Sequence, residues 1–150
     1  MPFLFYSMLS SKNIIPIDLL RIEDDGAHLV IKGRINGKLS RLLIDTGASR
    51  SVFDKERILH FTGERSFEEH DKYSTGLGTD SMPTSLTRLK TFRLGSLALK
   101  NFEVVLLDLS HVIKSYEKLG LTPIDGVIGN DILLNHKAVI DYRKMELKLK

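Results

Sequence analysis

The segment that decides the fold is Leu42-Leu43-Ile44-Asp45-Thr46-Gly47-Ala48-Ser49. An apolar run leads directly into an aspartate, a hydroxyl residue and a glycine, which predicts a buried strand that ends in a turn. The carboxylate of Asp45 then stands at the tip of that strand, and Gly47 permits another backbone to approach closely. Aspartate, threonine and glycine all suit turns, so the triplet taken alone also fits an ordinary strand end.

Strand patterns dominate the rest of the chain. The dipeptide Asn36-Gly37 lies between two apolar runs and is the pair most favoured in a two-residue β-hairpin. Further strands are predicted from apolar runs bounded by turn residues, at 14–20, 86–94, 97–107, 124–129, 139–141 and 145–149. Because Pro16 cannot donate a backbone hydrogen bond, the first of these is predicted as an edge strand. Asp24-Asp25-Gly26 predicts a turn.

Helical signals are few and short. We expect residues 50–62 to hold a strand end followed by a short helix, and a second short helix to run through Leu134, capped by Asn130 and Asp131. Residues 110–119 fit either a short helix or an irregular segment. Residues 63–83 are polar and contain glycines, which indicates a loop or hairpin rather than core.

The composition bounds what the protein is. A chain of 150 residues with 42% apolar and 27% charged residues fits one globular domain. The sequence contains no cysteine, which excludes disulfide scaffolds, thiolate metal sites and a cysteine nucleophile. We expect residues 1–22 to be an N-terminal extension that supplies an edge or dimer-interface strand, and residues 23–150 to be the single domain.

Charge and targeting patterns argue against several partners. The net charge is +3, and basic and acidic residues are interspersed without an aromatic-rich basic motif, so we expect no nucleic-acid partner. No apolar run approaches the ~18 residues that a membrane-spanning helix needs, so we expect no membrane partner. The apolar residues 1–9 lack a basic flank typical of an export signal, which favours the cytoplasm.

Four segments in sequence order resemble the retropepsin-like aspartic proteases, particularly their bacterial single-domain relatives. They are residues 43–49, 75–78, 125–133 and 138–142, and the resemblance runs from about Leu29 to Leu149. It implies an all-β fold, a closed β-barrel with a flap hairpin and one or two short helices. It also implies an aspartic endopeptidase, a hydrolase that acts on a peptide or protein without a cofactor.

Carboxylate-catalysed peptide hydrolysis needs two carboxyl groups, one to take a proton from water and one to protonate the carbonyl oxygen. The chain holds no second Asp-Thr-Gly or Asp-Ser-Gly, since Asp125 lacks the following hydroxyl residue and Asp141 is followed by Tyr142. The second carboxylate must therefore be Asp45 of an identical chain, which predicts an active homodimer and inactive monomers.

The resemblance implies the remaining roles. The Thr46 hydroxyl would hydrogen-bond across the dimer, and Gly47 would leave room for the substrate backbone. Ala48 would complete the active-site loop, and because alanine cannot donate a hydrogen bond to Asp45, we expect activity near neutral pH. The supporting segment beneath this loop would be Val127, Ile128 and Gly129. The flap over the substrate would contain Gly76, Leu77 and Gly78.

Other functions also fit parts of the sequence. A non-catalytic dimeric module that binds peptides or mediates assembly could use the same fold, because fold alone does not establish function. The cluster Glu68-Glu69-His70-Asp71 could hold a metal, but a solvated charge cluster is the better interpretation, so no metal is expected. The glycines at 76 and 78 lack the downstream residues of a phosphate-binding loop.

Overall fold

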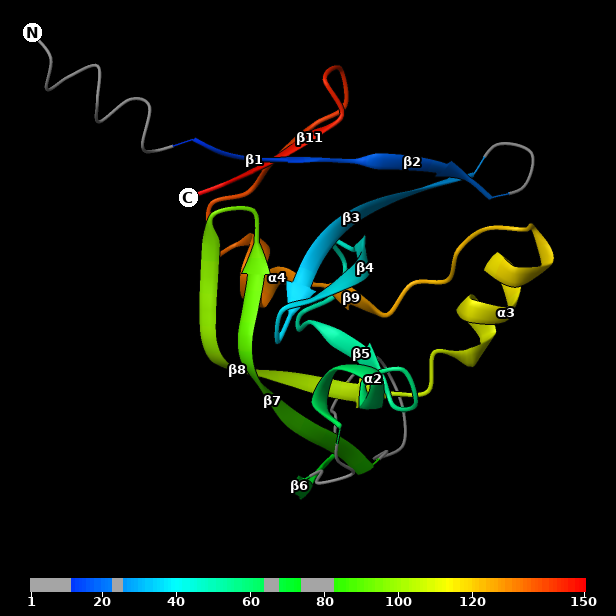
Figure 1. Ribbon diagram of the computed structural model, residues 1–150, viewed down its shortest axis with the longest axis vertical. Helices are drawn as coiled ribbons and strands as arrows, with labels where there is room; N and C mark the ends of the chain where they lie inside the picture. The colour runs from blue at the N-terminus through cyan, green and yellow to red at the C-terminus, as the bar shows by residue number, and fades with distance from the viewer. Residues whose placement is uncertain (1–11, 23–25, 64–67, 74–82) are drawn as a thin grey trace, which may run out of the picture.

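Six β-strands close into a ring in the computed structural model, which describes residues 12–22, 26–63, 68–73 and 83–150 (Figure 1). In sequence order the strands are β3 (Ala27–Ile35), β4 (Lys38–Ile44), β5 (Val52–Asp54), β7 (Pro83–Leu94), β8 (Leu97–Leu107) and β9 (Gly126–Ile128). Around the ring they follow the order β3, β4, β9, β5, β8, β7, and the pairing of Ile35 with Phe92 returns β7 to β3. The predicted all-β, closed-barrel fold is confirmed.

Two hairpins occur where the sequence predicts them. Asn36 and Gly37 have φ angles of 50° and 83°, the left-handed conformation that a tight two-residue turn requires, and they join β3 to β4. The turn at Gly95-Ser96 joins β7 to β8, whose antiparallel pairing extends from Leu94 and Leu97 to Ser85 and Leu106. Both predicted hairpins are therefore confirmed.

The inward-facing side chains of the barrel strands make the core. Along β3, Ile31, Gly33 and Ile35 are buried while the intervening Lys32 and Arg34 are exposed, the period of two expected of a strand with one face in the core. Phe53 and Phe92 pack edge to face inside the barrel, with ring centroids 5.8 Å apart. Each fully buried side chain of this size contributes about 1.5–3 kcal/mol.

Five further strands lie outside the ring: β1 (Asn13–Pro16), β2 (Asp18–Arg21), β6 (Glu68–Tyr73), β10 (Val139–Asp141) and β11 (Glu146–Leu149). Strands β1, β11 and β10 form a separate three-stranded sheet, whereas β2 pairs with β3 and β6 pairs with β7. Figure 1 shows β1 and β11 across one end of the molecule and the β6–β7 hairpin at the opposite end. The predicted strand at 14–20 is thus two strands, both at sheet edges, separated at Ile17.

Three helices occur in the described part of the chain, α2 (Leu59–Thr62), α3 (Ser110–Lys118) and α4 (Asn130–Leu133). Helix α3 is held by Tyr116, whose side chain is fully buried and whose hydroxyl lies 2.7 Å from Nδ1 of His28 on β3. Burial raises the pKa of Tyr116. None of the helices described is long and apolar enough to cross a membrane.

The predicted capping of α4 is wrong. The residue at its N-cap is Gly129, and no side chain caps the helix. Asn130 and Asp131 are the first residues of the helix, and their side chains instead bind the neighbouring segment 46–51 because its backbone and hydroxyl groups lie within hydrogen-bonding distance.

Several predictions concern residues whose placement is not described. The N-terminal residues 1–9, Asp24 and Asp25 of the predicted turn, and the flap residues Gly76, Leu77 and Gly78 all lie outside the described ranges. Strands β6 and β7, which precede and follow residues 74–82 in the sequence, are paired antiparallel.

Candidate active site

The active-site candidate is a loop that passes over the end of β9. Strand β9 lies between β4, with which it pairs parallel, and β5, with which it pairs antiparallel. The chain leaves β4 after Ile44, crosses the C-terminal end of β9 through residues 45–51, and enters β5 at Val52. The loop is thereby anchored at both ends to the same central strand.

Asp45 is the first residue of this loop. Its backbone N–H donates to the carbonyl of Ile128 at 3.0 Å, which extends the β4–β9 ladder by one residue. Its Oδ1 accepts the backbone N–H of Gly47 at 2.9 Å, and its carbonyl accepts the N–H of Ala48 at 3.2 Å. These hydrogen bonds hold the carboxylate in a defined position. Asp45, Thr46 and Gly47 are all exposed in the single chain, so the carboxylate faces outward.

The start of α4 holds the same loop from the other side. Asn130 donates from its backbone to the carbonyl of Ala48 and from its side chain to the carbonyl of Thr46, both at 2.8 Å. Asp131 accepts the N–H of Ser51 at 2.9 Å and its hydroxyl at 2.8 Å. Four hydrogen bonds thus connect two consecutive residues to both halves of the loop. Bonds to a carboxylate are among the stronger ones in proteins.

Gly129 fits where no larger residue would. A Cβ atom at this position would lie 2.7–2.8 Å from backbone atoms of Arg50 and Ala48. Its N–H donates to the Oγ of the fully buried Ser51 at 3.0 Å. The glycine therefore lets the backbone of the β9–α4 junction pack directly against the backbone of the loop 45–51.

A buried carboxylate supports β9 at its other end. Asp125, only 7% exposed, accepts the backbone N–H of Arg41 and the Nε–H of Arg57, each at 2.8 Å. Its own N–H donates to the Arg41 carbonyl at 2.8 Å. This network joins β4, β9 and the segment that follows β5, so it fixes the strands that carry the loop rather than the loop itself.

We predict that Asp125→Asn lowers the free energy of unfolding by about 1–2 kcal/mol, because it weakens a charge-assisted pair with Arg57. The expected loss is modest because the Arg57 side chain is 36% exposed and can be hydrated. Urea denaturation at neutral pH measures the change. As a control, Asp18→Asn changes an exposed aspartate in β2 and should leave the urea midpoint unchanged.

Charged side chains flank the end of the loop. Arg50 binds Glu103 on β8 at 3.0 Å, and Arg88 on β7 approaches the other oxygen of the same carboxylate at 3.4 Å. The arginine side chains are 45% and 62% exposed, so these pairs add little to stability. They do link the loop to the β7–β8 hairpin.

The other aspartate considered from sequence has a structural role. Asp141 accepts the backbone N–H groups of Lys144 and Arg143 in the turn after β10, and the hydrogen bond from Lys144 above all holds its pKa below the usual value. No group of three potential metal-ligating side chains occurs within the described ranges. The side chains of residues 68–71, a rival metal site, lie outside the description.

The structure brings the two predicted parts of the site together. Asp45, Thr46 and Gly47 are the exposed part of the loop and Ala48 is half-buried. Ile128 and Gly129 contact the loop, whereas Val127 pairs with Leu43 and Val52 on the strands at its two ends. Sequence reasoning missed Asn130 and Asp131 as hydrogen-bond partners of the loop, and Ser51 as the loop residue that binds Asp131. The pattern that could have indicated them is a run of short polar residues next to an apolar strand, but the same pattern is typical of a helix cap.

The sequence profile of the aspartyl protease family matches residues 31–132, a region that runs from β3 through the Asp45 loop into α4. The chain belongs to this family. Among curated proteins, none matches the sequence.

Solved structures resembling this aspartyl protease family member confirm the retropepsin-like fold. A retropepsin-like aspartic protease from Rickettsia conorii is 17% identical, with a TM-score of 0.57 and coverage of 93% of both chains. The retroviral protease-like domain of Ddi1 from Leishmania major is 18% identical, with a TM-score of 0.57 and coverage of 82% of this chain and 88% of that one. At these identities the similarity concerns the fold.

Proposed function

We propose that the protein is an aspartic endopeptidase that acts as a homodimer on peptide or protein substrates. The observation that carries this proposal is the placement of Asp45. Its carboxylate is exposed at the start of a loop that hydrogen bonds hold on both sides, in a chain of the aspartyl protease family. One chain contributes one such carboxylate, and a two-fold axis near the loop would bring a second copy beside it.

The chemistry requires the two carboxyl groups to share one proton. Two carboxylates placed close together cannot both ionise cheaply, so one is charged and the other is protonated. The charged group takes a proton from water as the water oxygen attacks the peptide carbonyl carbon, and the protonated group gives its proton to the carbonyl oxygen. Collapse of the tetrahedral intermediate, with proton transfer to the amide nitrogen, breaks the C–N bond.

Residues close to Asp45 in the sequence, together with a flap, would complete the catalytic site. The exposed Thr46 side chain is available to bind its counterpart across the dimer, and Gly47 leaves space for a substrate backbone. We assign the flap to the β6–β7 hairpin, with Gly76, Leu77 and Gly78 in its connection, where closure would exclude water from the reaction. Residues 23–150 would form the catalytic domain.

Peptidase assays over a range of protein concentrations test the proposal. With an unfolded casein-like substrate, specific activity should rise with protein concentration and level off once dimers dominate, and a pepstatin-type inhibitor should abolish it. No cleavage by a protein that sedimentation shows to be dimeric would instead support the non-catalytic peptide-binding or assembly module.

The pH profile tests the role of Ala48. We expect the wild type to be most active near neutral pH, and Ala48→Ser to move the acidic limb of the kcat/KM profile to lower pH. A serine hydroxyl that donates to Asp45 would favour the ionised carboxylate. The charged group that takes a proton from water would then persist to lower pH, and activity with it. Activity of the wild type that peaks near pH 3 would contradict this account of Ala48.

A further inference from the structure

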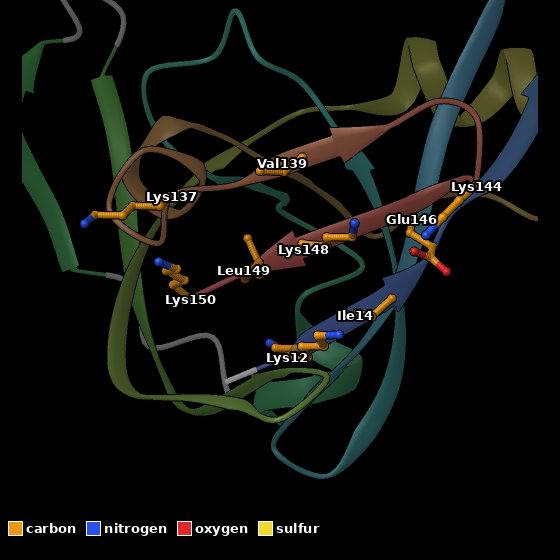
Figure 2. Close-up of a pocket in the computed structure, with 10 residues that line it drawn as sticks. Lys12, Ile14, Lys137, Val139, Lys144, Glu146, Lys148, Leu149 and Lys150 are labelled. Carbon is orange, nitrogen blue, oxygen red and sulfur yellow. The ribbon is translucent and has the colours of Figure 1, made fainter. Parts of the chain in front are cut away.

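A basic pocket lies on the outer face of the three-stranded sheet β1-β11-β10. Its volume is about 390 Å³, within the range of sites that bind ligands in proteins. Lysines supply half of the ten residues that line it: Lys12, Lys137, Lys144, Lys148 and Lys150. Figure 2 shows these side chains around the sheet.

The strand register explains why this face is both apolar and basic. Lys148 on β11 lies opposite Ile14 on β1 and Val139 on β10, so the three side chains share the outer face. Ile14 is 42% exposed and Val139 is 53% exposed. Leu147, the next residue on β11, points the other way into the core and is fully buried. The pocket thus has apolar side chains on the outer strands with a lysine between them.

The lining of the pocket carries an excess of positive charge. Five lysines and Glu146 give the pocket lining a formal charge of +4, one unit more than the net charge of +3 of the whole chain. Lys148 lies 3.9 Å from Asp141, while Lys12, Lys144 and Lys150 are exposed at the margins. Such a concentration of one sign attracts a ligand of the opposite sign.

We propose that this lysine pocket binds a short acidic peptide segment with an apolar side chain flanked by carboxylates. The apolar side chain would lie between Ile14 and Val139, and the flanking carboxylates would reach the lysines at the margins. Lysine is a mobile point charge on a flexible stem, which suits carboxylates spaced along a peptide.

Other occupants fit the pocket less well. A second copy related by a two-fold axis would place this +4 surface against itself, and like charges opposed across an interface are costly. Stacking of nucleic-acid bases needs aromatic side chains, and none of the lining residues that the structure describes is aromatic. A flat lipid surface does not match a concave site.

The lysine pocket and the proposed catalytic loop, residues 45–51, share no residue. Peptide binding should therefore persist in an Asp45→Asn background, in which no cleavage of the probe is expected. Failure of one proposal leaves the other intact.

Fluorescence anisotropy with three labelled pentapeptides tests the pocket in the full-length Asp45→Asn protein. The probe Glu-Glu-Leu-Glu-Glu should bind at least about tenfold more tightly than Gln-Gln-Leu-Gln-Gln, and more tightly than Glu-Glu-Ser-Glu-Glu. Affinity should fall as salt rises from low to physiological concentration. The double variant Lys144→Glu/Lys150→Glu should weaken binding of the first probe by at least about tenfold.

The matched control is Lys100→Glu/Lys114→Glu, which makes the same change in charge at exposed positions outside the pocket and should keep at least half of the affinity. Equal losses in both double variants would overturn the proposal, because net charge alone would then explain binding. Preferential, pocket-dependent binding of single-stranded DNA or anionic vesicles would overturn it as well. Self-association that only Lys144→Glu/Lys150→Glu removes would assign the face to a second copy and contradict it.

Discussion

Asp45→Asn is expected to lower kcat/KM toward peptides by about 10³-fold or more, since asparagine can neither take nor give a proton in the reaction. The fold should be unaffected. Asp45 is exposed, and the amide oxygen of asparagine can still accept the hydrogen bond from the Gly47 N–H. Steady-state kinetics at one pH and thermal unfolding of the same preparations measure both quantities.

The matched control for this variant is Asp18→Asn, which makes the same chemical change at an exposed residue of β2. It should retain wild-type kinetics. Equal turnover by wild type and Asp45→Asn would remove Asp45 from the chemistry and leave the protein as a binding module on a protease fold.

Gly129→Ala is the substitution expected to disturb the site most without touching a reacting group. The added Cβ would lie 2.7–2.8 Å from backbone atoms of Arg50 and Ala48, so the loop or the β9–α4 junction must move. Overpacking of this kind costs about 1–3 kcal/mol of unfolding free energy. Displacement of Asp45 by a fraction of an ångström should also lower kcat at least about tenfold.

Gly33→Ala separates the two effects. A Cβ at Gly33 would be as crowded, at 2.9 Å from the Arg93 carbonyl and from a Leu94 methyl, but it lies on β3 away from the loop. It should therefore destabilise the protein to a similar extent and leave kcat of the folded fraction unchanged. Both variants are assayed at a temperature where urea curves show each to be folded. Equal kcat values in the two variants would contradict the role given to Gly129.

The sequence predicts the parts of this fold that local chemistry determines. Asn36-Gly37 specifies a tight hairpin because both residues accept positive φ angles, and the alternation along β3 identifies its core face. The Asp45 triplet stands out because an apolar strand precedes it. These features depend on neighbours in sequence, so a pattern is enough to find them.

Interactions between distant segments were not predictable in the same way. Ser51 and Asp131 are 80 residues apart, and only the passage of β9 between β4 and β5 brings them together. Asn130 and Asp131 are residue types that commonly cap helices, but here their side chains form hydrogen bonds with Thr46 and Ser51 instead. Asp125 likewise pairs with Arg57, which is 68 residues away in the sequence, and no local pattern predicts this pairing.

The most direct test of the shared active site is subunit mixing. Wild-type protein is held at a fixed concentration at which it is fully dimeric, and an equal amount of Asp45→Asn is added and allowed to exchange. If each site needs Asp45 from both chains, half of the wild-type subunits enter inactive mixed dimers and activity falls to about half. Activity that stays constant after complete exchange would mean that one chain suffices, and would contradict the account.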